Sequence, residues 1–191
     1  GDRHFAQSPK IGIGCGPAAI HRIRRQRSKH KPPLVLGGVD IAFIGAGVGQ
    51  IAKIKGGIAI GSAGSDDKVA QLVEEFGFDH SFNYKTADPL AELRRGAPNG
   101  IDIYFENVGG AQLEAALTHI KLNGRIPVCG MIAHYNDGDT MTAGPRNLTE
   151  MIYKFVQMKG FVVSAFEDLR GQFVTDMSGW ISSGQMKYHE T

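Results

Sequence analysis

The chain has 191 residues, of which 42% are hydrophobic, and a formal net charge of +2, so it can bury the core of one domain. No apolar run approaches the roughly 20 residues that a membrane-spanning helix needs. Its two cysteines, Cys15 and Cys129, lie far apart, which argues against a disulfide framework and a structural zinc site. We therefore expect a cytoplasmic protein with no metal site and no membrane segment.

Residues 1–38 differ in kind from the rest of the chain. Residues 1–40 hold eight lysines and arginines but only two aspartates, with a basic run over residues 21–31. Because no sustained helix or strand period is visible there, we expect an irregular or partly disordered head over residues 1–38 and a folded domain over residues 39–191. Nucleic-acid binding by the basic run is the less favoured alternative, since the run lacks the interleaved aromatic residues of a base-stacking surface.

The folded domain is expected to be organised around residues 39–57, VDIAFIGAGVGQIAKIKGG. An apolar run at 41–44 meets three closely spaced glycines, and a helical pattern follows. A strand, a glycine turn and a helix N-terminus together bind a pyrophosphate, so we predict cofactor contacts at Gly45 and Gly47. The spacing fits G-x-G-x-G rather than G-x-G-x-x-G. A plain βα turn, in which Gly49 only packs the helix against the strand, is therefore the alternative.

Strands and helices alternate from there to the end of the chain. Ser65 and Asp88-Pro89 carry helix-start signals, and Asn147 with Glu150 has the spacing of a capping box. This alternation predicts an α/β fold with a doubly wound parallel sheet, Rossmann-like, of about six strands with helices on both faces. Such a sheet binds ligands beyond the carboxyl ends of its strands, where the strand order reverses. The strands are expected at residues 41–44, 58–60, 80–84, 101–105, 125–131 and 161–166, and the helices at 48–54, 65–76, 88–96, 113–120, 147–155 and 169–181.

Eight segments carry a family resemblance by their order and spacing: Val48–Gly56, Ala63–Lys68, Phe82–Lys85, Gly100–Gly110, Arg125–Gly130, Gly144–Asn147, Met158–Val163 and Lys187–Thr191. Together they resemble the zinc-free branch of the medium-chain dehydrogenase/reductases, and most closely the NADP-dependent alkenal, double-bond and prostaglandin reductases. The resemblance implies NADP as cofactor and hydride transfer from NADPH to the C=C bond of a small enone or enal. It also implies a homodimer formed through the strand at residues 161–166.

The resemblance assigns the NADP 2′-phosphate to Lys68, with Gly64 and Ser65 beside it. The second predicted strand ends without the acidic residue that NAD-specific folds place there, which fits this assignment. The alternative for Lys68 is a solvated helix lysine next to two acidic residues that compensate the helix dipole. We keep NADP binding as the favoured interpretation.

The resemblance places further cofactor contacts after the later strands, and a catalytic role on Tyr153. A phenol near the substrate carbonyl could stabilise the enolate that forms after hydride delivery, and an interfacial helix tyrosine is the alternative. The alternatives are a half-buried aromatic at a strand end for Tyr84, a tight-turn residue for Asn107, and core packing in a strand for Phe161 and Val163. These cofactor residues are Tyr84, Asn107, Cys129, Gly130, Tyr135, Phe161 and Val163.

Two departures from the family limit what the resemblance implies. Full-length relatives carry a separate β-rich catalytic domain, for which residues 1–38 are too short, and Ala42 stands where the family has a glycine. The alternative function is therefore a non-catalytic NADP-binding or interaction module, or a folded gene remnant. A short-chain dehydrogenase is excluded because no tyrosine in the chain is followed by a lysine four residues later.

Overall fold

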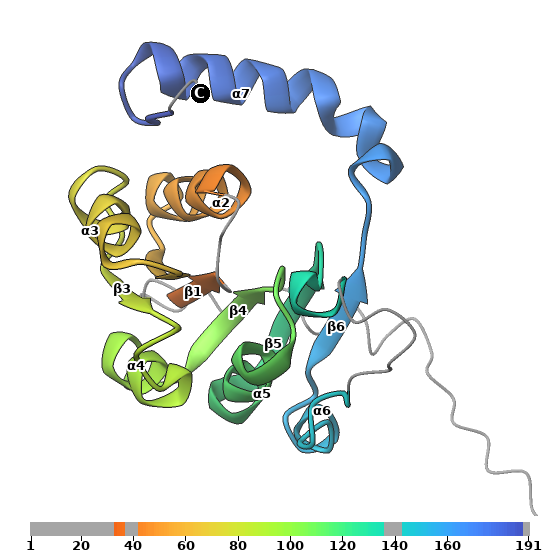
Figure 1. Cartoon of the computed structure of the whole chain (residues 1–191). Helices are drawn as coiled ribbons and strands as arrows, with labels where there is room; N and C mark the ends of the chain where they lie inside the picture. The colour runs from red at the N-terminus through yellow and green to blue at the C-terminus, as the bar shows by residue number, and fades with distance from the viewer. Residues whose placement is uncertain (1–32, 37–41, 136–142, 189–191) are drawn as a thin grey trace, which may run out of the picture. The chain divides into compact units, whose positions relative to one another are not determined.

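The computed structural model describes residues 33–36, 42–135 and 143–188. Within these ranges six parallel strands form one sheet in the order β3-β2-β1-β4-β5-β6 (Figure 1). The strand order reverses between β1 and β4, so the predicted doubly wound parallel sheet is confirmed. The strands are β1 (Pro33–Leu36), β2 (Ile58–Ala63), β3 (His80–Asn83), β4 (Ile101–Phe105), β5 (Ile120–Val128) and β6 (Gln157–Gly160).

Helices cover both faces of the sheet (Figure 1). α2 (Ala42–Ile54) and α3 (Asp66–Glu74) lie on one face, and α4 (Pro89–Gly96), α5 (Gly110–His119) and α6 (Glu150–Tyr153) lie on the other. Two short 3₁₀ segments, η1 (Ile132–His134) and η2 (Val163–Leu169), follow β5 and β6, and α7 (Arg170–Ser182) ends the described helices. None of the described helices is long and apolar enough to cross a membrane.

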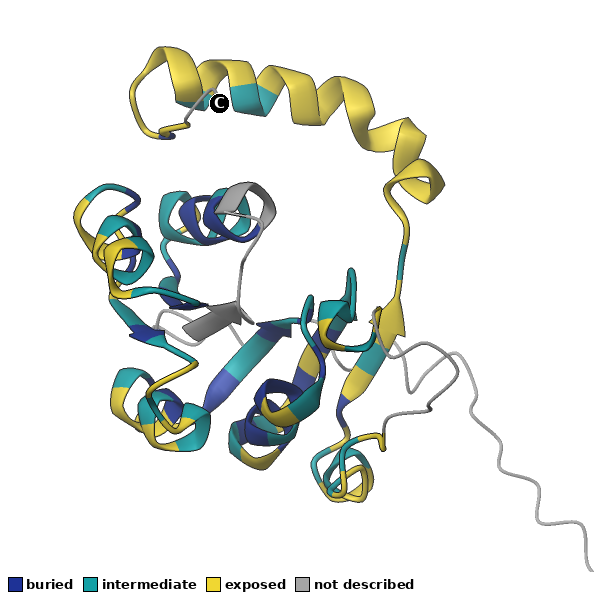
Figure 2. Cartoon of the chain, viewed as in Figure 1, coloured by how far each residue is buried: buried dark blue, intermediate teal, exposed yellow. Residues whose placement is uncertain are grey.

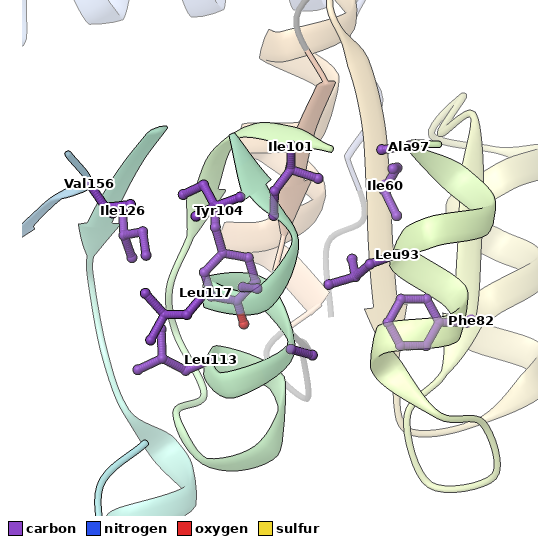
Figure 3. Packing of buried hydrophobic residues seen from close by; sticks show 13 residues of the cluster. Ile60, Phe82, Leu93, Ala97, Ile101, Tyr104, Leu113, Leu117, Ile126 and Val156 are labelled. Carbon is purple, nitrogen blue, oxygen red and sulfur yellow. The ribbon is translucent and has the colours of Figure 1, made fainter. Parts of the chain in front are cut away.

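The larger hydrophobic cluster fills the space between the sheet and the pair α4 and α5 (Figure 3). On α5, Leu113 and Leu117 lie one turn apart and are buried against the sheet. Tyr104 of β4 points toward them, and Ile126 of β5 packs beside it. These contacts hold α5 against β4. Because α5 follows β4 after a short loop, its N-terminal end lies at the carboxyl edge of the sheet.

A smaller cluster on the other face is built around Phe78, a buried side chain in the loop between α3 and β3. A Cβ atom on Gly61 of β2 would lie 2.8 Å from Cε1 of Phe78, and one on Gly49 of α2 would overlap the same ring. Phe78 therefore fits between α2 and β2 only because both positions are glycine. This agrees with the interpretation of Gly49 as a packing residue.

The predicted first strand and its glycine turn are wrong. Residues 42–44, expected in a strand, begin α2, and Gly45 and Gly47 lie inside that helix. The central strand is β1, which lies within the predicted head and pairs with both β2 and β4. A short apolar run is ambiguous between strand and buried helix, and here it continues the helical pattern of the residues after it. Residues 37–41, between β1 and α2, lie outside the described residues, as does the basic run at 21–31.

The sixth strand is also misplaced, because β6 ends at Gly160 and residues 163–169 form η2. The prediction of a strand at 161–166 rested on the apolar residues of that segment, which are common in strands. The segment that pairs with β5 is instead the more polar QMKG of residues 157–160. The capping box at Asn147 does not form either. Its side-chain amide donates to the carbonyl of Glu114 and the hydroxyl of Thr118 instead, and α6 is one turn long.

The boundaries of the remaining elements lie close to the predicted ones, apart from β5, which was expected at residues 125–131 and instead begins at Ile120 and ends at Val128. β4 has the predicted bounds, and α4 begins after Asp88, whose carboxylate accepts from the N–H groups of Leu90 and Ala91. Ser65 is the N-cap residue of α3, although its hydroxyl makes no capping bond.

Two glycines of α2 provide a test of the packing around Phe78. Gly47→Ala is expected to raise the free energy of unfolding by up to about 1 kcal/mol, because alanine favours the helix and a Cβ there meets no atom within 4 Å. Gly49→Ala is expected to lower it by about 1–3 kcal/mol, because the ring of Phe78 must move. Urea unfolding of both variants measures the difference, and a shift in the same direction for both would contradict this packing.

Candidate functional site

Two loops lie side by side where β4 and β5 end, next to the point where the strand order reverses. The backbone carbonyl of Glu106 accepts from the N–H groups of Cys129 at 2.9 Å and Gly130 at 3.3 Å. The carbonyls of Asn107 and Val108 accept from the N–H groups of residues 132 and 133 at 3.1 and 3.0 Å. These bonds join residues 106–109 and 129–135 into one wall at the carboxyl edge of the sheet.

Glu106 also holds the first loop with its side chain. This residue is 0% exposed, and its Oε1 accepts from the N–H of Val108 at 2.5 Å and of Gly109 at 2.7 Å. Burial raises the pKa of its carboxyl above the ordinary value, although the bonds from Gly109 and Val108 act in the opposite direction. Sequence reasoning missed Glu106. The available signal was a charged residue directly after an apolar strand and before two glycines.

Polar side chains crowd the backbone of this wall where it carries glycine. A Cβ on Gly130 would lie 2.7 Å from Oδ1 of Asn107 and 2.9 Å from Oη of Tyr135, whose hydroxyl accepts from the N–H of Met131 at 3.2 Å. On the first loop, Gly109 has a φ of 83° and faces the imidazole of His134. The structure therefore brings together the predicted residues Asn107, Cys129, Gly130 and Tyr135, and it adds His134 and Glu106.

A second group of predicted residues follows β2 and β3. Gly64 and Ser65 lie between β2 and α3, and Lys68 is in the first turn of α3. Tyr84 follows β3, and its N–H donates to the carbonyl of Ala63 at 3.1 Å. Because these strands are parallel to β4 and β5, this group lies at the same carboxyl edge as the wall formed by the two loops.

Acidic residues lie close to Lys68. Asp66 and Asp67 occupy the first turn of α3, and Oδ1 of Asp66 accepts from Nδ2 of Asn83 at 2.7 Å. The amide of Asn83 thus engages one of the two carboxylates. Backbone N–H groups at this helix end also favour a negative ligand.

Two predicted residues follow β6. The N–H of Phe161 donates to the carbonyl of Val128 at 3.2 Å, and its ring makes edge contacts with Phe105 and Phe166 at centroid distances of 6.1 and 6.0 Å. Phe161 is therefore at the carboxyl edge, beside the end of β5. Val163 is 83% exposed.

The remaining predicted residues lie in helices rather than in the loops at the strand ends. Gly45 and Gly47 lie within α2 rather than in a turn. Tyr153 is 75% exposed and is the last residue of α6. The next residue, Lys154, donates to two carbonyls at the C-terminal end of α5, whereas the Asn107 loop precedes the N-terminal end of that helix. A catalytic role for Tyr153 stays a prediction.

Comparisons with known proteins agree on one family. Residues 44–178 match the family model described as zinc-binding dehydrogenase. The chain is 47% identical over 148 residues to the 2-alkenal reductase (NADP(+)-dependent) of Nicotiana tabacum, with 77% of this chain and 43% of the relative covered. It is 44% identical over 149 residues to prostaglandin reductase 1 of Rattus norvegicus, with 77% and 45% covered.

A solved structure with the same fold has NADPH bound. The crystal structure of CurA from Vibrio vulnificus in complex with NADPH superposes with a TM-score of 0.77 at 33% identity, covering 84% of this chain and 49% of that one. The chain thus spans about half the length of the relatives it matches.

The buried carboxyl of Glu106 should make stability depend on pH. Its raised pKa means that the folded state binds this proton more tightly than the unfolded state does, for which the ordinary value is 4.5. The stability gained from that proton is fully present below the unfolded pKa and is lost as the pH rises through the folded pKa. Glu106→Gln has no such proton, so the stability of the wild type minus that of the variant should fall with rising pH.

Urea unfolding of both proteins between about pH 4 and pH 8 measures this difference. Taking the difference cancels the titration of the other carboxyl groups. A difference that is independent of pH would contradict an ionisable carboxyl that is buried at this position.

Proposed function

Because the chain belongs to the zinc-binding dehydrogenase family and is similar to prostaglandin reductase 1 and to an NADP(+)-dependent 2-alkenal reductase, we propose that it forms the NADP-binding part of a double-bond reductase. The substrate class is an α,β-unsaturated carbonyl compound, an enone or enal. The observation that carries the proposal is the wall formed by residues 106–109 and 129–135 beside the β1/β4 switch point, where doubly wound sheets bind dinucleotides.

The residues at this edge fit a dinucleotide. At Gly130 a Cβ would lie 2.7 Å from Oδ1 of Asn107 and 2.9 Å from Oη of Tyr135, so a side chain there would displace these polar groups, whereas glycine leaves them in place to face a ligand. Gly64, Ser65 and Lys68 would hold the 2′-phosphate end at the start of α3. Asn107, Cys129 and Tyr135 would hold the nicotinamide end. Tyr84, after β3, and Phe161, after β6, would flank the cofactor at the two sides of the sheet.

When bound, NADPH supplies a hydride for the β-carbon of the substrate. The residues of this chain bind and orient: the amide of Asn107 and the hydroxyl of Tyr135 offer hydrogen bonds, and the phenyl rings of Phe105 and Phe161 offer an apolar border that excludes water. We propose that no zinc takes part and that the protein works in the cytoplasm. The two widely separated cysteines support both statements.

We further propose a homodimer. β6 is one of the two edge strands of the sheet, and no strand among the described residues pairs with its outer edge, which can therefore pair with a second copy. Beyond it Val162 and Val163 are 66% and 83% exposed, so a partner would bury apolar surface there. Light scattering after size exclusion is expected to give the mass of two chains, and Val162→Lys combined with Val163→Lys is expected to give one. A monomeric wild type would contradict the proposal.

Lys68 provides the test of cofactor choice. Lys68→Ala is expected to weaken NADP⁺ binding by about tenfold or more and to leave NAD⁺ binding unchanged, because only NADP⁺ has the 2′-phosphate. Lys121→Ala is the matched control, since this lysine pairs with Asp102 at 2.9 Å where β4 and β5 begin, at the other edge of the sheet. Calorimetric titration measures both. Equal losses for the two nucleotides would show that Lys68 does not read the phosphate.

Turnover separates the reductase from the non-catalytic alternative. We expect the chain to bind NADPH, observed as a change in nicotinamide fluorescence, and then to oxidise it when a 2-alkenal or an enone is added. Binding without turnover would favour a non-catalytic module, whose site needs further protein around it for reaction. Tyr153→Phe tests the proposed catalytic role of Tyr153 only if the wild type turns over. Absence of binding would contradict the proposed function altogether.

A further inference from the structure

We propose that Glu106 is a positioning residue, whose buried carboxylate fixes the Asn107–Gly109 loop in the conformation that receives the nicotinamide end of the cofactor. This inference rests on the proposed NADP binding, but the state of the loop can be measured without any cofactor. Glu106 itself is fully buried, so it acts through the loop and does not touch a ligand.

The first argument is the direction of its hydrogen bonds. One carboxylate oxygen accepts from two successive loop amides, those of Val108 and Gly109, at 2.5 and 2.7 Å. Gly109 is the N-cap residue of α5, where backbone amides lack partners within the helix. The side chain therefore closes the loop onto the strand that precedes it and supplies the negative charge that a helix N-terminus favours.

The second argument is that a charge is placed where burial disfavours it. The other oxygen, Oε2, is buried and has no hydrogen-bond partner among the described residues. The same is true of the hydroxyl of Tyr104, two residues earlier on β4. A residue that only filled space here would be apolar, since an unpartnered buried oxygen costs stability. The charge is compensated by the amides of the loop, with the two short bonds from Val108 and Gly109 the main ones, and by His134 of η1 nearby. These groups belong to the loop and to the wall that it joins, which indicates that the side chain serves to hold the loop.

The third argument is that the loop it fixes determines the rest of the wall. The carbonyls of Asn107 and Val108 accept from the N–H groups of Ile132 and Ala133, and η1 begins there. Oδ1 of Asn107 lies against Gly130. If the loop moved, η1 would lose two of its bonds, and Tyr135, which follows η1, would shift relative to Asn107.

Glu106→Leu and Glu106→Gln test the proposal, with Tyr104→Phe as the matched control. Leucine removes both acceptor oxygens at similar volume, glutamine keeps one neutral acceptor, and the control removes a buried oxygen from the same strand without touching the loop. For each protein, amide hydrogen exchange by NMR and NADP⁺ affinity by calorimetry are measured, after a thermal melt has established that it is folded.

Faster exchange at Val108 and Gly109 is expected in Glu106→Leu, spreading to Ile132 and Ala133. Cys129 and Gly130 should stay protected, because they bond to the backbone carbonyl of residue 106. The affinity for NADP⁺ should fall by about tenfold or more in Glu106→Leu, which has no acceptor for the loop amides. The loss should be smaller in Glu106→Gln, because its neutral oxygen still accepts from the loop, although more weakly than a charged carboxylate does. Tyr104→Phe should behave as the wild type in both measurements.

Unchanged exchange at Val108 and Gly109 in folded Glu106→Leu would overturn the proposal, and so would unchanged NADP⁺ affinity in a variant whose loop exchanges faster. If Glu106→Leu does not fold, Glu106→Gln with the same two measurements decides. If the wild type binds no NADP⁺, the proposed function fails, while the exchange data still show whether Glu106 fixes the loop.

Discussion

The candidate site depends on the hydrogen bonds that converge on Glu106 at the end of β4. Its carbonyl binds the amides of the loop after β5, and its carboxylate binds the amides of its own loop. A parallel sheet brings the carboxyl ends of its strands to one edge but leaves the loops there without ladder partners. Glu106 supplies partners to both loops at once. The polar groups of Asn107, Tyr135 and His134 then occupy fixed places beside the β1/β4 switch point.

Much of the fold was predictable from the sequence, because the alternation of apolar strands with capped amphipathic helices is strong between residues 58 and 128. The first strand was not, since the four residues of β1 lie within a basic segment and carry no period of their own. The apolar run at 41–44 was the more conspicuous signal, and it belongs to α2. Short central strands are identified by their neighbours in the sheet, which the local sequence does not contain.

The candidate site was predictable where resemblance pointed to strand ends, and the structure brings Asn107, Cys129, Gly130 and Tyr135 together. It was not predictable where the contacts are long-range. Nothing in the spacing of residues 106 and 129 shows that their backbones are bonded, and Glu106 is a polar residue that only burial reveals as unusual. The reverse holds at η2, where apolar residues at 161–166 predicted a strand, and the apolar residues of η2 and α7 are not buried. There Figure 2 shows a mostly exposed surface with Phe166, Leu169, Phe173 and Val174 among its exposed residues. Exposed apolar surface of this kind marks sites of interaction with other protein.

A crystal structure of the chain with NADP⁺ tests the account most directly. The account predicts the nicotinamide end of the cofactor against residues 107–109 and 129–135, with its 2′-phosphate at Lys68 and the Glu106 carboxylate still bonded to the amides of Val108 and Gly109. A cofactor bound elsewhere on the chain, or one bound here after the loop has left Glu106, would contradict it.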